Sequence, residues 1–135
     1  MNRVRATWMI ALLLLFGSAL TLGPSTQAQA VCPGLTKASY TAFDTETITV
    51  SNTAVGFTEA TFRPGTDSRQ WAQFAAFSTE GDDLRYWPDG TAPTSASGHL
   101  ITADSSGVVC GVDALPDFLM IRVTGDVTVR VSYYR

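Results

Sequence analysis

His99 is the only histidine in the chain, and histidine is the side chain that enzymes use most often as a general base. A Ser-His-Asp site needs that imidazole beside a serine nucleophile and an oriented carboxylate. Serines are abundant, but the sequence contains no G-x-S-x-G motif. His99 follows Gly98 at the start of a predicted strand, where it is expected to be a surface or turn residue. The sequence therefore predicts no catalytic residue and no enzymatic activity.

Carboxylates suggest a second kind of chemistry, because oxygen ligands of this type hold Ca²⁺ in proteins. The acidic residues that lie closest together in the sequence are Glu80, Asp82, Asp83 and Asp89. Their spacing is not that of an EF-hand, and acidic residues in turns are usually solvated. A transition-metal site is not expected either, because such a site needs several donor side chains and the chain has one histidine. We expect no metal and no cofactor.

Aromatic side chains suggest a third kind of chemistry, because their flat faces pack against pyranose rings. The candidates for such a surface are Trp71, Trp87 and Tyr134. Tyr86 shares a face with Leu84 and is expected in the core, so Trp87 would point outward beside a turn. Tyr134 falls on the polar face of the last predicted strand. Packing at a sheet edge explains these residues about as well as sugar binding does.

The N-terminal residues have the pattern of a secretory signal peptide. Arg3 and Arg5 precede an apolar run of about fifteen residues, shorter than the roughly twenty that a membrane-spanning helix needs. Ala28-Gln29-Ala30 supplies the small residues that cleavage requires. We predict a signal peptide over residues 1–30 and one domain over residues 31–135. The location is expected to be secreted, periplasmic or extracellular, with no membrane insertion after cleavage.

The chain has two cysteines, Cys32 and Cys110, and both follow the predicted cleavage site. In an exported protein an even number of cysteines predicts a disulfide. The spacing fits neither a C-x-x-C redox motif nor a zinc site. We therefore predict a Cys32–Cys110 disulfide that stabilises the fold by roughly 4.5 kcal/mol.

The charge of the predicted mature chain limits the kinds of partner. All twelve acidic residues follow residue 30, whereas two of the nine basic residues precede it. The mature chain is thus more acidic than the whole chain, whose net charge is −3. An acidic domain without a basic cluster is a poor ligand for nucleic acid or an anionic membrane. The expected partner is a protein or a surface glycan, which the sequence does not identify.

Apolar and polar residues alternate along the mature chain, and no helical period persists. The clearest strand is residues 126–134, with Val127, Val129, Val131 and Tyr133 on one face. Residues 118–123 form another, and Gly125-Asp126 between them predicts a β-hairpin. The other predicted strands are residues 45–51, 55–62, 71–78, 84–87, 99–102 and 108–112. About seven to nine short strands predict an all-β, antiparallel β-sandwich, immunoglobulin-like or similar.

A turn and a surface loop are predicted between the strands at residues 84–87 and 99–102. The residues that shape this connection are Pro88, Asp89, Gly90, Pro93, Thr94 and Gly98. Proline presets φ, aspartate bonds to nearby amides, and glycine accepts the exit geometry. Gly98 allows a turn or a bulge before the next strand. The sequence thus predicts a turn here rather than a site.

The pattern Y-x-x-D-G-x-x-P-T, from Tyr86 to Thr94, resembles the strand-turn-strand segment of the chitobiase C-terminal-type β-sandwich, an immunoglobulin-like accessory domain. It is also similar to small β-sandwich proteins among phage and prophage structural genes. In those proteins a terminal hairpin ends in V-x-Y, as Val131-Ser132-Tyr133 does here. This second resemblance runs from near Glu46 to Arg135, and it implies a sandwich without catalytic residues. The export signal and the cysteine pair favour a secreted or cell-surface relative over a virion protein.

A small, exported, disulfide-linked β domain without a recognisable active site is expected to be a non-catalytic structural or protein-interaction module. Its setting would be the cell surface or a virion-like assembly. The alternative is a carbohydrate-binding accessory protein. The last strand would also be able to pair with a neighbouring chain if it lies at a sheet edge.

Overall fold

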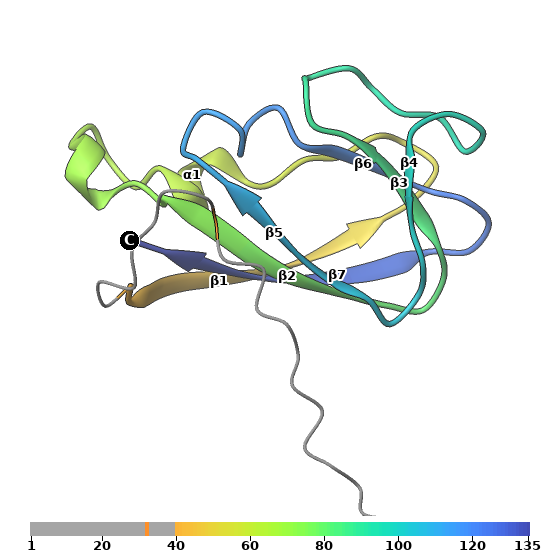
Figure 1. The fold of residues 1–135 in the computed structure, drawn as a ribbon, viewed down its shortest axis with the longest axis horizontal. Helices are drawn as coiled ribbons and strands as arrows, with labels where there is room; N and C mark the ends of the chain where they lie inside the picture. The colour runs from red at the N-terminus through yellow and green to blue at the C-terminus, as the bar shows by residue number, and fades with distance from the viewer. Residues whose placement is uncertain (1–31, 33–39) are drawn as a thin grey trace, which may run out of the picture.

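A computed structural model describes Cys32 and residues 40–135. Seven strands form two antiparallel sheets, which pack face to face around one core (Figure 1). The predicted all-β sandwich is confirmed. The predicted signal peptide, residues 1–30, lies outside the described residues and stays a prediction. No helix in the described part of the chain is long and apolar enough to cross a membrane.

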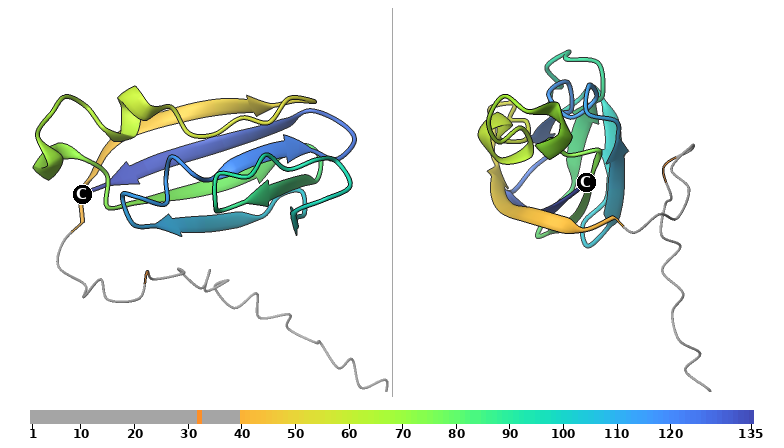
Figure 2. Two further views of the ribbon diagram at one scale, coloured as in Figure 1. Left: turned by 90° about the horizontal axis from the view of Figure 1, so that it is seen from above. Right: turned by 90° about the vertical axis from the view of Figure 1, so that its left-hand side faces the viewer.

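Each sheet has a simple order of neighbouring strands. The larger sheet contains, in order, β1 (Ala42–Val50), β7 (Val127–Tyr134), β2 (Phe74–Glu80) and β5 (Ser106–Cys110). The smaller sheet contains, in order, β4 (His99–Ile101), β3 (Leu84–Trp87) and β6 (Leu119–Arg122). Two short helical turns, α1 (Glu59–Phe62) and η1 (Ser68–Gln70), connect β1 to β2. Figure 2 shows the smaller sheet stacked over the larger one.

The order of the strands is that of a jelly roll. Val55 makes an isolated antiparallel bridge to Met120 of β6, and this bridge stands where the second of eight strands would be. Counting it, the first strand pairs with the last, the second with the seventh, the third with the sixth and the fourth with the fifth. The ABED and CFG sheets of an immunoglobulin domain pair differently. The predicted antiparallel sandwich is therefore present, but its strand order is not that of an immunoglobulin domain.

The predicted hairpin between the last two strands is wrong. β6 pairs with β3 in the smaller sheet, whereas β7 lies between β1 and β2 in the larger one. The short connection crosses from one sheet to the other, and the Asp82 carboxylate fixes it by accepting the N–H of Gly125 at 2.6 Å. Because β7 is central, it is not a free edge that pairs with another chain. Alternation identifies a strand with one buried face, but not the sheet it joins.

The segment predicted as a strand at residues 55–62 is also different. Only Val55 pairs with a strand, and Glu59–Phe62 forms the helical turn α1. This turn places the fully buried Phe62 against Tyr133, with ring centroids 6.1 Å apart. Two strand boundaries shift as well, since β2 begins at Phe74 rather than at Trp71 and β5 spans Ser106–Cys110.

Tyr133 anchors the core of the sandwich. Its side chain is fully buried, and its hydroxyl donates a hydrogen bond to the Glu46 carboxylate of β1. The same carboxylate accepts the backbone N–H of Thr58 at 3.1 Å, which attaches the segment before α1 to β1. Burial raises the pKa of Tyr133 well above its ordinary value, and the hydrogen bond to Glu46 adds to this effect.

Tyr133 is expected to make the protein sensitive to alkaline pH. Its pKa is higher in the folded chain than the unfolded value of about 10, so the unfolded chain releases this proton first. The free energy of unfolding should therefore fall by up to about 1.4 kcal/mol per pH unit above about pH 10. Urea unfolding from about pH 8 to about pH 11 measures this dependence.

The control for this prediction is Tyr133→Phe, which removes the titrating hydroxyl but keeps the ring. It should cost about 1 kcal/mol at neutral pH, because one hydrogen bond is lost. Above about pH 10 its stability should fall less steeply than that of the wild type. Equal slopes in the two proteins would contradict the role given to Tyr133.

Candidate functional site

The predicted disulfide is present. Cys32 and Cys110 are bonded, with their Cα atoms 5.5 Å apart and a sequence separation of 78 residues. Cys110 is the last residue of β5, an edge strand of the larger sheet. The bond therefore attaches the N-terminal part of the chain to that edge.

The connection between β3 and β4 begins with the turn that the sequence indicated. Asp89 accepts the N–H of Thr91 at 3.0 Å, and Gly90 has the positive φ of 79° that favours glycine. Gly90 also donates its N–H to the carbonyl of Asp117 at 2.9 Å. Pro88 is exposed beside them. The turn is thus fixed by one hydrogen bond within it and by another to Asp117 in the segment before β6.

The rest of the connection folds back on the smaller sheet. Thr94 and Ser97 exchange two backbone hydrogen bonds of 3.0 and 3.1 Å. Arg85 of β3 donates to the carbonyl of Ser95 at 3.1 Å and to that of Gly98 at 2.8 Å. Pro93 is buried, which a freely solvated loop would not require. The loop is therefore a fixed part of this side of the molecule.

The strands on either side of this connection, β3 and β4, pair with each other and form a surface of aromatic and apolar side chains. Tyr86 pairs with His99 across β3 and β4, and their ring centroids lie 5.3 Å apart. The Trp87 ring meets His99 edge to face at 4.9 Å. Leu100 is 49% exposed and is the only large apolar residue of the described part that is classed as exposed. Leu100 follows His99 in the edge strand β4 and pairs with Arg85, so its side chain lies on the other face of that strand. We call the four residues at this edge, Tyr86, Trp87, His99 and Leu100, the His99 patch.

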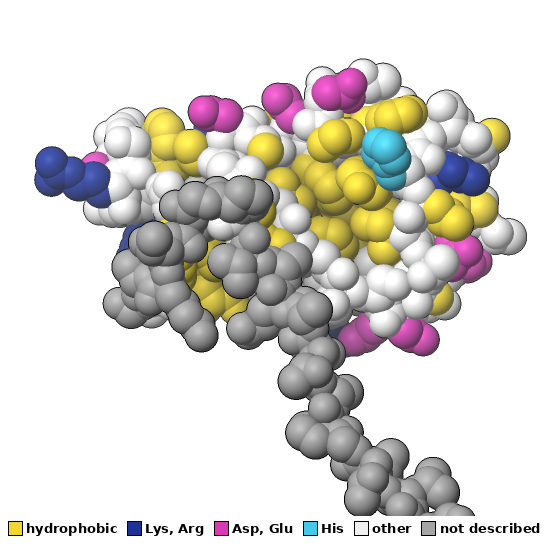
Figure 3. Space-filling view, in the orientation of Figure 1, with side chains coloured by type: hydrophobic (Ala, Val, Ile, Leu, Met, Phe, Trp, Pro, Cys, Tyr) yellow, Lys and Arg dark blue, Asp and Glu magenta, His cyan; other side chains and the backbone are white. Residues whose placement is uncertain are grey.

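Figure 3 shows how the His99 patch lies on the surface. The single histidine stands beside a continuous hydrophobic area, and acidic side chains follow the upper rim of this face. Trp87 and Tyr86 are half-buried, so each presents only part of its ring to solvent. Tyr86 is thus less buried than the sequence predicted. Trp87 is next to the turn, as predicted, and its ring packs against His99.

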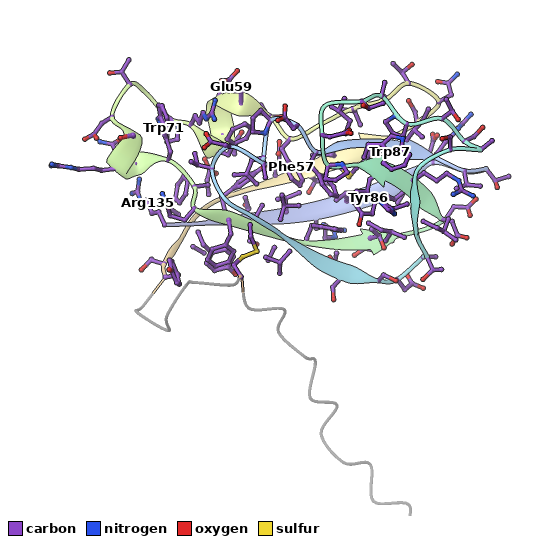
Figure 4. The ribbon with its side chains drawn as sticks, turned by 45° about the horizontal axis from the view of Figure 1, so that its top comes forward. Phe57, Glu59, Trp71, Tyr86, Trp87 and Arg135 are labelled. Atoms are coloured by element: carbon purple, nitrogen blue, oxygen red, sulfur yellow. A yellow bond between two sulfur atoms is a disulfide. The ribbon has the colours of Figure 1, made fainter. Side chains whose placement is uncertain are left out.

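A chain of stacked rings connects the patch to the core. Phe118 stacks on Tyr86 with centroids 4.7 Å apart and on Phe57 at 5.4 Å. It also packs against Phe77 of β2 at 5.7 Å. Figure 4 shows Phe57, Tyr86 and Trp87 in the same part of the molecule. Because the core fixes Phe118, the patch has a rigid base.

The other two aromatic candidates do not belong to this surface. Trp71 donates its indole N–H to the carbonyl of Gly65 at 3.3 Å and lies 5.1 Å from the Arg63 guanidinium. Trp71 and Trp87 lie toward opposite ends of the molecule (Figure 4). Tyr134 is half-buried and stacks on Phe74 at 4.7 Å, on the outer face of the larger sheet. Trp71, Trp87 and Tyr134 therefore form no common platform.

His99 lies on the surface, where the sequence expected it. Within the described residues, no hydrogen bond joins its imidazole to a serine or to a carboxylate. Its nearest ring partners are Tyr86 and Trp87. In this arrangement the exposed imidazole packs against two aromatic rings.

The acidic residues considered for calcium each have protein partners. Arg130 donates to Glu80 at 2.8 and 3.2 Å, and this pairing lowers the pKa of Glu80. The N–H groups of Asp83 and Gly125 lower the pKa of Asp82, and Asp83 accepts the N–H of Ala103 at 2.9 Å. Cys32 and residues 40–135 contain no group of three or more acidic, histidine or cysteine side chains placed to hold a metal. Asp82 and Asp83 thus fix connections between strands, whereas Glu80 pairs with Arg130 across the neighbouring strands β2 and β7.

A shallow hollow lies beside the loop that follows the turn. Its volume is about 220 Å³, and its lining consists of Asn52, Ser95, Ile121, Arg122, Val123 and Thr124. Pockets that enclose drug-sized ligands are larger, roughly 300–1,000 Å³. The hollow includes no residue of the His99 patch, so we do not assign it a ligand.

Sequence reasoning missed the patch because it treated residues 84–100 as two unrelated ends of a loop. A β-hairpin centred near Pro93 would have placed Tyr86 opposite His99, as the structure does. That register was the available signal. No family model matches this chain, and neither does any curated protein or solved structure.

Proposed function

We propose that this protein is a non-catalytic structural or protein-interaction module that works outside the cytoplasm, in a cell-surface or virion-like assembly. The His99 patch is its contact surface. The observation that carries the proposal is the exposure of Leu100 at the β4 edge, next in sequence to His99, whose ring packs against the half-buried rings of Tyr86 and Trp87. Aromatic residues on a rigid base are typical centres of protein interfaces.

The disulfide supports a location outside the cytoplasm, because such bonds persist in oxidising compartments. The predicted signal peptide agrees with this location. The resemblance to phage-type and chitobiase-type sandwiches is specific only in its turn motif, so the assembly role rests on the patch.

Carbohydrate binding is the second candidate, because Trp87 and Tyr86 are half-buried rings beside an imidazole. The three rings meet edge to face or tilted, at 41° and 70°. They therefore do not form the flat row on which several sugar rings would stack. A single sugar residue against Trp87 is the form of this alternative that the geometry allows.

Photo-cross-linking in the cells that produce the protein tests the proposed surface. A photo-reactive amino acid replaces Leu100 in one variant and Thr47, on the far edge strand β1, in the other. We expect protein adducts from position 100 and not from position 47. Adding Trp87→Ala should reduce the adduct from position 100 about ten-fold, as expected for an interface residue worth about 1.4 kcal/mol.

Two results would contradict this proposal. The first is cross-linking from both positions to the same extent, which indicates contact without a defined surface. The second is the absence of adducts from position 100 together with retention on an insoluble polysaccharide that Trp87→Ala abolishes. In that case the carbohydrate-binding role replaces the protein-interaction role. Trp71→Ala is the matched control, because Trp71 lies away from the patch.

A further inference from the structure

We infer that the partner of this surface is a second copy of the same chain, joined through the edge strand β5. The inference rests on the proposed function, because it names the partner of the His99 patch. Two β5 strands would pair antiparallel across a two-fold axis and make one continuous sheet from the two larger sheets.

The backbone groups of β5 alternate between its neighbour β2 and the outside. Ser105 accepts the N–H of Thr79 at 2.8 Å, and Gly111 donates to the carbonyl of Gln73 at 2.8 Å. Residues 105, 107, 109 and 111 therefore face β2, because antiparallel pairs alternate along a strand. The N–H and C=O groups of Ser106, Val108 and Cys110 face away from the sheet. None of these groups has a hydrogen-bond partner within Cys32 and residues 40–135.

Among the described residues, the other edge of the larger sheet carries protecting features that β5 lacks. β1 contains a register shift between Ala42 and Asp44, and the Asp44 carboxylate accepts the outward N–H of Thr45 at 2.8 Å. β1 also carries the charged residues Asp44 and Glu46. Bulges and charges of this kind prevent edge pairing. The β5 sequence, SGVVC, has no charge, no proline and no bulge.

The edge strands of the smaller sheet offer fewer backbone groups for pairing with a second chain. The outer side of β6 is occupied, since Met120 and Val55 exchange two backbone hydrogen bonds of 2.8 Å. Val123 donates to the carbonyl of Asp83 at 3.0 Å, so the backbone groups of Asp83 and Arg85 face β6. Those of Leu84 and Tyr86 then face β4, where they pair with Ile101 and His99. It follows that, in the three-residue strand β4, only Leu100 has outward backbone groups. This strand is too short to hold a partner strand alone, but it can add to a neighbouring contact.

β5 fits a second β5 without like charges meeting. With the two-fold axis at Val108, this residue faces Val108 of the second copy, and Ser106 faces Cys110. All three are uncharged, which matters for an acidic protein with a net charge of −3. A two-fold axis perpendicular to the joined sheet places both smaller sheets on the same side. The two β4 edges, with Leu100 and His99, then face each other and cover the His99 patch.

Sedimentation of the purified, oxidised protein tests this dimer. We expect a concentration-dependent change from monomer to dimer. Val108→Pro should raise the dissociation constant about ten-fold or more, because it removes the central outward N–H without breaking a bond to β2. Thr47→Pro on β1 is the matched control, because its N–H also faces away from the sheet, and it should leave the dissociation constant unchanged.

A charge exchange tests the register even if the proline variant folds poorly. Val108→Lys and Val108→Glu should each be monomeric, because like charges meet at the axis. Their mixture should form a heterodimer. A wild-type protein that stays monomeric at its highest soluble concentration would overturn the inference, as would a dimer that survives in both charged variants. If cross-linking from position 100 then captures a different protein, the proposed function stands and only this dimer fails.

Discussion

Removal of the Cys32–Cys110 disulfide is expected to lower the free energy of unfolding by about 4.5 kcal/mol. The bond closes a loop of 78 residues, which spans most of the domain, and so restricts the unfolded chain far more than the folded one. The variant is Cys32→Ser combined with Cys110→Ser, because a single replacement leaves a reactive thiol. Urea unfolding of the oxidised wild type and of the double variant measures the difference.

The reduced wild type is the control for this experiment, since it keeps both side chains and loses only the bond. It should be destabilised to the same extent as the double variant. Cys110 is also the last residue of β5. Self-association of the reduced protein and of the double variant should therefore weaken only to the extent that β5 becomes less ordered. A loss of stability below about 1 kcal/mol in both forms would contradict the role of this loop closure.

Phe118→Ala is expected to lower the free energy of unfolding by about 3–5 kcal/mol. Phe118 is 4% exposed, and its ring contacts those of Phe57, Phe77 and Tyr86. Removing the ring leaves a cavity between the two sheets, where Phe118 contacts Phe77 of β2 and Tyr86 of β3. Tyr86 loses the ring on which it stacks, so the His99 patch should also lose its defined shape. Urea unfolding measures the first effect, and partner binding in folded protein measures the second.

Two further variants separate stability from binding. Phe118→Leu keeps part of the volume and should destabilise the fold less than Phe118→Ala does, although it also removes the ring on which Tyr86 stacks. Leu100→Ala should leave stability nearly unchanged, because its side chain is 49% exposed, but it should weaken partner binding. A Phe118→Ala protein that is nearly as stable as the wild type would contradict the role of Phe118. So would a Leu100→Ala protein that is strongly destabilised.

The strands that the sequence predicted best are those with one polar and one apolar face. β7 buries Val127, Val129, Val131 and Tyr133 and leaves Arg130 exposed, as alternation requires. β1 likewise buries Ile48 and Val50. The disulfide followed from the cysteine count and the export signal. These features depend on local patterns, which a single sequence contains.

The errors concern relations between strands. β6 and β7 are separated by only a few residues, yet a crossing fixed by Asp82 places them in different sheets. Alternation contains no information on that choice. Residues 55–62 were expected to form a strand because their apolar residues match one, but α1 uses Phe62 to fill the core.

The candidate site was predictable only in part for the same reason. Trp87 was identified as a surface aromatic, whereas Trp71 and Tyr134 pack elsewhere. His99 and Leu100 became part of the surface only once β3 and β4 were paired in register. A contact surface built from several segments depends on that register, which the turn motif alone does not determine.

Labelling of His99 with diethyl pyrocarbonate tests the central claim most directly, because the chain has only one histidine and its peptide reports on the patch alone. The claim is that the His99 patch is the surface on which the partner docks. The rate of labelling is measured by mass spectrometry in dilute monomer and in the partner-bound protein. We predict a high rate in the monomer and at least about a ten-fold lower rate in the bound form, as expected for a group within an interface. An equal rate in both forms would show that the partner binds elsewhere and would contradict this account.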